Sequence, residues 1–214
     1  MALIKSALEL ALERTKNLEV DETAIEANRI KTEGRRTAGK FLDDPTGCNL
    51  ASAIGGVDTS NRELFRKSVF DVLCAQIQLP GVYFDPEKIT VIGAGLGTLA
   101  AAAPGKSKGA CAAAEKQVAA MMQQISAFLT KYQEEVKRVE QAIRSQWAPK
   151  LKEKERQMAA RMGQEIRLDP MADPEFAAFY KKNVEGLKAS YGSALEQAKL
   201  EIAGLSGFGE DVAE

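Results

Sequence analysis

The sequence predicts an all-α protein built on a long antiparallel coiled-coil helical hairpin, with a smaller helical region at the N-terminus. Three observations lead to this prediction. Apolar residues alternate at spacings of four and three between residues 118 and 143, namely Val118, Met122, Ile125, Leu129, Tyr132, Val136, Val139 and Ile143. A second apolar stripe with similar spacing runs from residue 176 to 205. The connection between the two stripes is short enough to make the helices antiparallel neighbours.

The first stripe predicts one helix over residues 108–162. Its alternation is the seam of a coiled coil, because a 3.5-residue repeat keeps those positions on one face. Beyond Ile143 the next apolar residues are Trp147 and Leu151, and two spacings of four locally unwind the supercoil. Pro149 lacks the N–H that an interior helical position needs, so we expect a kink there. Met158 and Met162 continue the seam, and Gly163 is a suitable helix stop.

The second helix is predicted to begin at Asp173-Pro174-Glu175. Aspartate is a favoured N-cap, proline suits the first helical position, and an acid in the first turn complements the helix dipole. Its stripe includes the aromatic residues Phe176, Phe179, Tyr180 and Tyr191. We expect these rings to pack in the core between the helices, not to stack on a ligand.

The N-terminal region, residues 1–80, is predicted to be helical as well. Residues 2–17 form an amphipathic pattern, and a more polar helical stretch runs from Asp21 to about Leu42. The glycine-rich run up to Val57 is expected to be loop. Residues 60–63, Ser-Asn-Arg-Glu, match a capping box that opens a helix ended by Pro80-Gly81. The expected organisation is therefore this region, a connecting segment at 81–107, the hairpin at 108–206 and a flexible tail at 207–214.

The connecting segment at 81–107 is rich in glycine and alanine. Residues 89–98 are β-branched and then glycine-rich, which predicts an irregular helix or a helix followed by loop. The run Ile92–Gly97 resembles a dinucleotide-binding turn, but Thr98 stands where the third glycine belongs. Residues 89–105 carry no charge, yet their glycine and alanine content is too weakly apolar for a membrane span.

Pro104-Gly105-Lys106-Ser107 resembles the end of a phosphate-binding loop, although Ala100 replaces the glycine that such a loop needs. A phosphate could still meet Lys106 and the N–H groups that open the long helix. The alternative function is therefore binding of a nucleotide or phosphate ligand by residues 92–107, with Gly105, Lys106 and Ser107 as its site.

Composition excludes several classes of function. The chain has no histidine, so no Ser-His-Asp or Cys-His nucleophile and no histidine-ligated zinc can form. We expect no enzyme activity, no cofactor and no metal. A net charge of −1 argues against a dedicated nucleic-acid binder. The basic run Lys150–Arg156 alternates with acidic residues, which is typical of a solvated helix face. RNA contact along this run is a weaker alternative. The three dispersed cysteines, Cys48, Cys74 and Cys111, and the absence of a signal-peptide pattern favour the cytoplasm.

Three stretches resemble a family of uncharacterised bacterial helical proteins. They are Trp147-Ala148-Pro149-Lys150-Leu151, the run from Arg167 to Phe176 with its two Asp-Pro pairs, and the opening run Ile4–Arg14. The similarity covers residues 1–16 and about 140–205, without the glycine-rich middle. The resemblance implies a helical fold and a bacterial cytosol, and it implies no catalytic residue.

The function expected from these observations is that of a non-enzymatic interaction or adaptor protein acting through the hairpin. Two helices leave part of their apolar surface uncovered, and Met121, Phe128, Trp147 and Phe179 are the candidate interaction residues. Such surface meets the N-terminal helices, a second copy or another protein. We therefore expect a protein partner or a homo-oligomer, with no nucleic acid and no membrane span.

Overall fold

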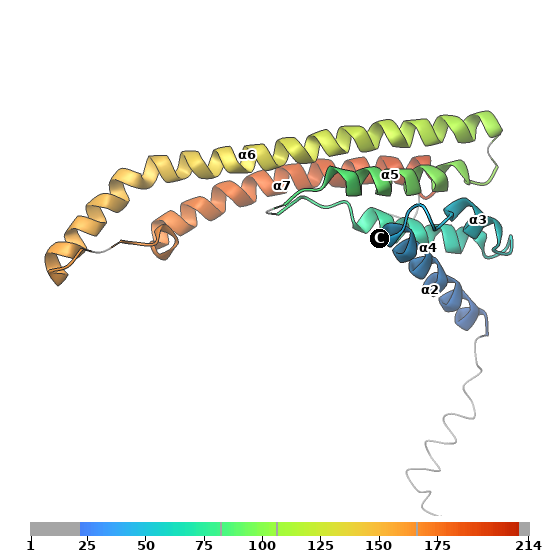
Figure 1. The fold of residues 1–214 in the computed structure, drawn as a ribbon, viewed down its shortest axis with the longest axis horizontal. Helices are drawn as coiled ribbons and strands as arrows, with labels where there is room; N and C mark the ends of the chain where they lie inside the picture. The colour runs from blue at the N-terminus through green and yellow to red at the C-terminus, as the bar shows by residue number, and fades with distance from the viewer. Residues whose placement is uncertain (1–21, 82, 106, 166, 210–214) are drawn as a thin grey trace, which may run out of the picture.

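The computed structural model describes residues 22–81, 83–105, 107–165 and 167–209, and within these ranges the chain is all-helical. The α-helices are α2 (Glu22–Asp43), α3 (Leu50–Gly55), α4 (Arg62–Ala75), α5 (Pro86–Ala101), α6 (Lys108–Met162) and α7 (Pro174–Leu205), and a short 3₁₀ helix, η1 (Pro170–Ala172), precedes α7. Figure 1 shows α6 along the full length of the molecule with α7 beside it, and α5 along the first half of α6. The helices α2, α3 and α4 lie on the side of α5 away from α6. The amphipathic stretch expected at residues 2–17 falls outside the described residues.

The bounds of the two longest helices confirm the predictions from local sequence. Ser107 caps α6, its hydroxyl accepting a bond from the N–H of Ala110 at 3.3 Å, and Gly163 ends it with a positive φ of 68°. A residue in the left-handed conformation commonly ends a helix, and glycine adopts this conformation without steric strain. Asp173 caps α7 through the N–H groups of Glu175 and Phe176, as the Asp-Pro-Glu run indicates. The helix continues through Pro149 and curves towards its C-terminal end (Figure 1).

The connecting segment contributes a regular helix, α5, where the sequence predicted an irregular helix or a helix followed by loop, and residues 89–98 all lie within α5. The reason is packing, because the glycines of α5 let neighbouring helices come close on several sides. A Cβ on Gly95 would lie 2.7 Å from a ring carbon of Phe41 and 2.8 Å from a methyl carbon of Leu73. A Cβ on Gly93 would lie 3.0 Å from that of Met122 on α6. Intrinsic helix propensity is therefore overridden by tertiary contacts in this segment.

Two further details of the N-terminal half differ from expectation. The run before Val57 contains a short helix, α3, whose N-cap Asn49 accepts a bond from the N–H of Ser52 at 3.0 Å. The capping box expected at residues 60–63 is wrong, since α4 is preceded by Asn61 without a side-chain cap. Glu63 instead accepts two bonds from Arg66, at 2.7 and 2.6 Å.

Buried apolar side chains form two separate cores. The main core joins α2, α3, α4 and α5 to the first part of α6 and the last part of α7, and its α6 and α7 members run as far as Leu129 and Leu195. Phe208, in the stretch expected to be a flexible tail, belongs to it and packs against Phe70 in a tilted arrangement at 5.0 Å between ring centroids. We call the elements that share this core the helical body. The second core is a small cluster formed by α6 and α7 alone.

Arg66 is the largest side chain completely buried in the helical body. Its guanidinium donates to the carbonyl of Leu99 at the end of α5 (2.7 Å) and to the carbonyl of Ser206 just after α7 (2.9 Å). Its central carbon lies 4.9 Å from the centre of the Phe208 ring. Carbonyls at helix ends lack partners within their own helix, so one arginine satisfies two of them and joins three helices.

Candidate protein-interaction surface

The part of α6 and α7 that extends past the helical body is the candidate functional region. We call residues 139–180 the distal arm. Its buried core consists of Ile143 and Leu151 from α6 and Phe176 from α7, with partly buried residues from the same two helices around them. Figure 1 shows this part of the molecule, coloured yellow to orange, projecting beyond α5 and the N-terminal helices. The distal arm is thus accessible from several sides.

Aromatic rings hold the distal arm together. The ring of Trp147 meets Phe176 edge-on at 5.7 Å between centroids and Phe179 at 5.8 Å. Phe176 is 1% exposed and stacks on Tyr180 at 6.1 Å. Tyr180 also donates a hydrogen bond to the carboxylate of Glu140 on α6. Edge-on and offset ring pairs of this kind contribute about 0.5–1.5 kcal/mol each beyond the area they bury.

Ion pairs fasten the start of α7 to α6 near the tip of the arm. Lys150 binds Glu175 at 2.8 Å, and Lys154 binds both Asp173 and, at 3.4 Å, Glu175. The hydrogen bond from Lys154 holds the pKa of Asp173 below its ordinary value, helped by the N–H of Phe176. Lys150 likewise lowers the pKa of Glu175. Lys150 also lies over the Trp147 ring, 4.5 Å from its centroid, so the basic run contributes to arm packing.

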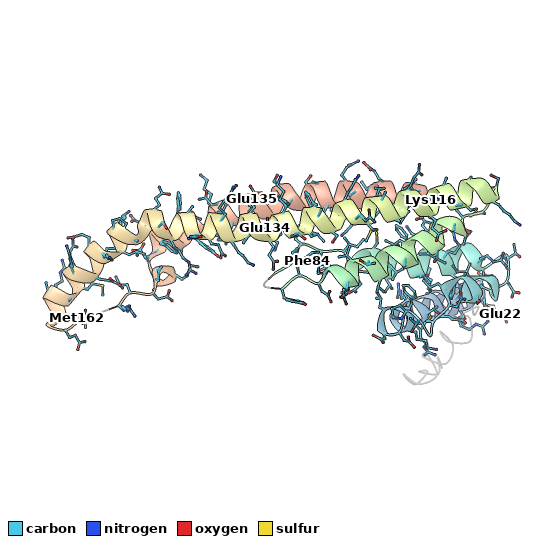
Figure 2. All side chains as sticks on the ribbon, turned by 45° about the horizontal axis from the view of Figure 1, so that its top comes forward. Glu22, Phe84, Lys116, Glu134, Glu135 and Met162 are labelled. Carbon is cyan, nitrogen blue, oxygen red and sulfur yellow. The ribbon has the colours of Figure 1, made fainter. Side chains whose placement is uncertain are left out.

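Methionines are exposed at the tip of the arm. Met158 is 39% exposed, Met162 59% and Met171 51%. The sequence placed Met158 and Met162 on the buried seam, and that prediction is wrong. The seam ends there because α7 begins only at Pro174, so Met158 lines an open hollow beside the start of α7 and not a filled seam. Figure 2 shows Met162 at the end of the molecule farthest from the labelled Glu22 and Lys116.

A hollow of about 330 Å³ lies between the last turns of α6 and the start of α7. It is lined by Lys154, Gln157, Met158, Arg161, Leu168, Ala172, Asp173 and Pro174. The backbone around it is held in place by Glu155, which accepts a bond from the N–H of Leu168 at 3.0 Å, and by Asp169, which accepts one from Met171 at 3.0 Å. The lining of the hollow is thus partly apolar and partly charged, and we call its apolar residues the floor and its charged residues the rim.

The four predicted interaction residues fall into two places. Trp147 and Phe179 are half-buried in the distal arm and contact each other. Met121 and Phe128 are half-buried at the helical body, where they line a hollow of about 230 Å³ between α6 and α7. Phe128 packs on Tyr191 at 4.7 Å between ring centroids. All four residues thus pack against other residues of the same chain. The sequence analysis did not identify the exposed methionines as interaction residues, because their spacing suits a buried seam.

The alternative phosphate site is only partly described. Gly105 has a positive φ of 73°, and Ser107 uses its hydroxyl to cap α6, while Lys106 lies outside the described residues. The glycines at 93, 95 and 97 lie within α5 and face side chains of other helices. They therefore form no loop whose N–H groups could surround a phosphate.

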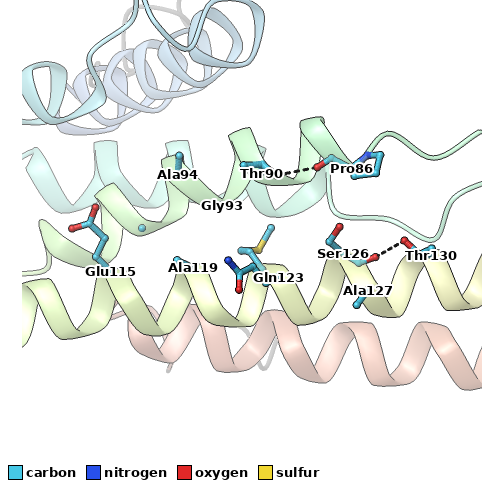
Figure 3. Close-up of a pocket in the computed structure, with 12 residues that line it drawn as sticks. Pro86, Thr90, Gly93, Ala94, Glu115, Ala119, Gln123, Ser126, Ala127 and Thr130 are labelled. Atoms are coloured by element: carbon cyan, nitrogen blue, oxygen red, sulfur yellow. Dashed lines mark hydrogen bonds between the residues drawn. The ribbon is translucent and has the colours of Figure 1, made fainter.

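A second surface feature is the groove between α5 and α6, with a volume of about 540 Å³ (Figure 3). Small residues such as Gly93, Ala94 and Ala119 line it, and among its described lining residues Glu115 is the one charged side chain. The hydroxyls of Thr90 and Thr130 donate to carbonyls of their own helices, Pro86 at 3.1 Å and Ser126 at 2.9 Å. These two hydroxyls are thus used within their own helices, which leaves Glu115, Gln123 and Ser126 as the other polar side chains in a lining of mostly small residues.

The described part of the chain contains no cluster of three or more side chains suited to a metal ion. Cys74 is largely buried, and burial raises the pKa of its thiol to about 11, so the reactive thiolate is scarce at neutral pH. None of the helices in the described ranges has the length and apolar character needed to cross a membrane.

Comparison with models of known protein families gives a match over most of the chain. Residues 51–204 match a family described as "Family of unknown function (DUF6657)". The matched range includes the glycine-rich middle as well as both long helices, and it confirms the expectation of an uncharacterised family. No curated protein and no solved structure matches the chain.

Proposed function

Because the chain belongs to DUF6657, a family of unknown function, we propose its function from its own geometry: a non-enzymatic adaptor that binds a protein partner through the distal arm. The observation that carries the proposal is the separation of the two cores. The helical body is stabilised by its own core, while the arm is held by a second, small cluster that serves only the arm. An extension of this kind adds exposed surface without adding stability to the body.

The arm works as an antiparallel coiled-coil hairpin in this proposal. Ring contacts support opposite chain directions for α6 and α7. Near the body Phe128 of α6 contacts Tyr191 of α7, whereas farther out Trp147, later in α6, contacts Phe176, earlier in α7. Burial of Ile143 and Leu151 supports a seam that continues past the body. From residue 139 to 162 the α6 part of the arm is about 35 Å long, at about 1.5 Å per residue. That length is enough to present the tip well away from the body.

The surface chemistry of the tip also supports a protein partner. Three methionines in the outer half of the arm are partly exposed, and methionine adapts its shape to different apolar partners. Exposed apolar side chains on a projecting part of a protein are candidate contact points for a protein partner. The groups that a catalytic site needs, such as an activated nucleophile beside a base, have no counterpart among the arm residues described above.

The proposal is tested by removing the arm from the full-length chain. Residues 144–179 are replaced by a short Gly-Ser linker, which joins the helices next to the Glu140–Tyr180 contact. Wild-type and shortened proteins, each expressed at native level in the source cells, are used for affinity capture followed by mass spectrometry. We expect partners captured by the wild type to be lost from the shortened protein, while circular dichroism shows that the body still folds. Equal capture by both proteins would place binding on the body and refute the proposal.

Self-association is measured on the same two proteins by light scattering. An oligomer of the wild type that becomes a monomer on removal of the arm would make a second copy the partner. An unchanged mass together with partner loss supports the adaptor role for a different protein. A melting temperature raised by nucleotide or phosphate in both proteins would favour the ligand-binding alternative at residues 92–107 instead.

A further inference from the structure

We propose that the hollow at the tip of the distal arm binds an acidic peptide segment that carries an apolar side chain. This inference rests on the proposed adaptor function and names the chemistry of its partner. It is carried by three features of the tip: an apolar floor, a guanidinium without an ion-pair partner among the described residues, and a carboxylate that is already neutralised.

The apolar floor comes from residues on both sides of the hollow. Met158 contributes from α6, and Leu168, Ala172 and Pro174 contribute from the connection and the start of α7. Met158 is partly exposed and has three rotatable bonds, so it can close around an incoming side chain. The free volume of about 330 Å³ is at the lower end of the range for small-ligand pockets. An apolar side chain of a peptide therefore has both room and a matching surface.

The rim of the hollow favours a negative charge. Two cations, Lys154 and Arg161, line it beside one carboxylate, Asp173. Asp173 is satisfied by Lys154 and by the N–H groups of Glu175 and Phe176. Arg161 makes no ion pair within the described residues and is exposed. Its planar guanidinium can donate two parallel hydrogen bonds to a carboxylate, which makes it the specific binding group for an acidic side chain.

The shape of the site favours a short segment over a second copy of the chain. The apolar surface of the tip is limited to a few side chains, and stable dimers bury about 800 Å² on each partner. A short acidic segment needs far less area, and charge attraction at the rim increases its association rate.

The test selects ligands from a displayed library of random short peptides against the full-length protein. We expect enriched peptides to combine aspartate or glutamate with a neighbouring leucine, phenylalanine or tryptophan. Binding of a selected peptide is then measured by fluorescence anisotropy at low and high salt. The affinity should fall as salt rises, because the contact at the rim is exposed and electrostatic.

Two matched substitutions identify the site. Arg161→Glu reverses the charge at the rim and should weaken peptide binding at least about tenfold, a loss of roughly 1.4 kcal/mol. Arg156→Glu makes the same change on the same helix, about 140° around the axis at 3.6 residues per turn, and is not among the lining residues. It should leave the affinity within about twofold, a free-energy change well below the tenfold step.

Several outcomes would overturn the inference. Selected peptides without acidic residues, or equal losses for the two substitutions, would exclude the proposed chemistry. Failure to select any peptide would do the same. If Arg161→Glu leaves cellular capture unchanged while removal of the arm abolishes it, the adaptor function stands and the acidic-peptide partner is wrong. A change of oligomeric mass in Arg161→Glu without peptide binding would assign the hollow to a second copy.

Discussion

Replacing Arg66 with methionine tests whether one buried arginine joins the ends of α5 and α7 to α4. The side chain is 0% exposed and donates to Glu63, to the carbonyl of Leu99 and to the carbonyl of Ser206. Methionine has a similar length and fills much of the same space, but it donates no hydrogen bond. The substitution therefore removes the hydrogen bonds that Arg66 donates, while the methionine side chain keeps the cavity left by the arginine small.

The expected loss follows from the groups left behind. A buried carbonyl deprived of its partner costs about 1–3 kcal/mol, so the two carbonyls together cost about 2–6 kcal/mol. Glu63 is 48% exposed and regains contact with water, so it adds little. Relief from burying the guanidinium charge offsets part of the loss. We expect a net destabilisation of about 3 kcal/mol, with lysine in place of Arg66 giving a smaller loss because it can still reach part of the acceptor set.

Urea unfolding followed by circular dichroism measures the effect, and Arg29→Met is the control. Arg29 also binds a glutamate three residues earlier, Glu26 at 2.8 Å, but its side chain is 71% exposed. The two substitutions therefore break the same type of local ion pair in opposite environments. We expect no measurable change for Arg29→Met. Similar small changes in both variants would refute the conclusion that Arg66 joins the helix ends.

Three further predictions concern other contacts. Gly34→Ala should destabilise the protein by about 1–3 kcal/mol, because the new Cβ would lie 2.8 Å from that of Ser68. Gly39→Ala in the same helix is the control, because a Cβ at that position would have nothing within 4 Å, and it should stabilise the protein by up to about 1 kcal/mol. If both substitutions changed the free energy of unfolding in urea in the same direction, close packing of α2 on α4 would be excluded. Phe176→Ala should destabilise the distal arm by about 3–5 kcal/mol. Fluorescence of Trp147, the single tryptophan, should therefore report unfolding at lower urea than circular dichroism of the whole chain does. One shared transition would contradict two separate cores. Asp173 has a lowered pKa when folded, so its stabilising effect is present above the ordinary aspartate value near pH 4 and is lost as the pH falls through the folded value. Trp147 fluorescence between pH 6 and pH 2 should show the arm loosening in that range, and an identical profile for Asp173→Asn would exclude this carboxylate as the cause.

Most helix bounds could be predicted from the sequence because they depend on residues within one turn. Ser107 and Gly163 bracket α6, and Asp173 with Pro174 begins α7, each through contacts with the nearest residues of the chain. The capping box at residues 60–63 failed for a related reason. A side chain such as Glu63 has other nearby partners, and Arg66 competes successfully for it.

The candidate site was predictable only in part. Trp147 and Phe179 could be recognised as arm residues because they are large, apolar and correctly spaced. The methionine tip could not, because Met158 and Met162 keep the spacing of a seam and their exposure depends on where α7 begins. Arg161 is one of several similar charged residues in the sequence, and the hollow beside it arises only when the connection folds back on α6.

The all-helical class, the length of the two main helices and the residue types available for chemistry follow from the amino-acid sequence alone, since propensity, capping and composition are local or additive properties. Contacts between distant segments explain why the glycines of α5 serve close helix packing, and why Arg66 is buried against carbonyls 33 and 140 positions away along the chain. The tertiary structure also leaves the last turns of α6 exposed. These outcomes depend on which distant segments meet, and periodicity along one segment carries no information about the segment that will face it.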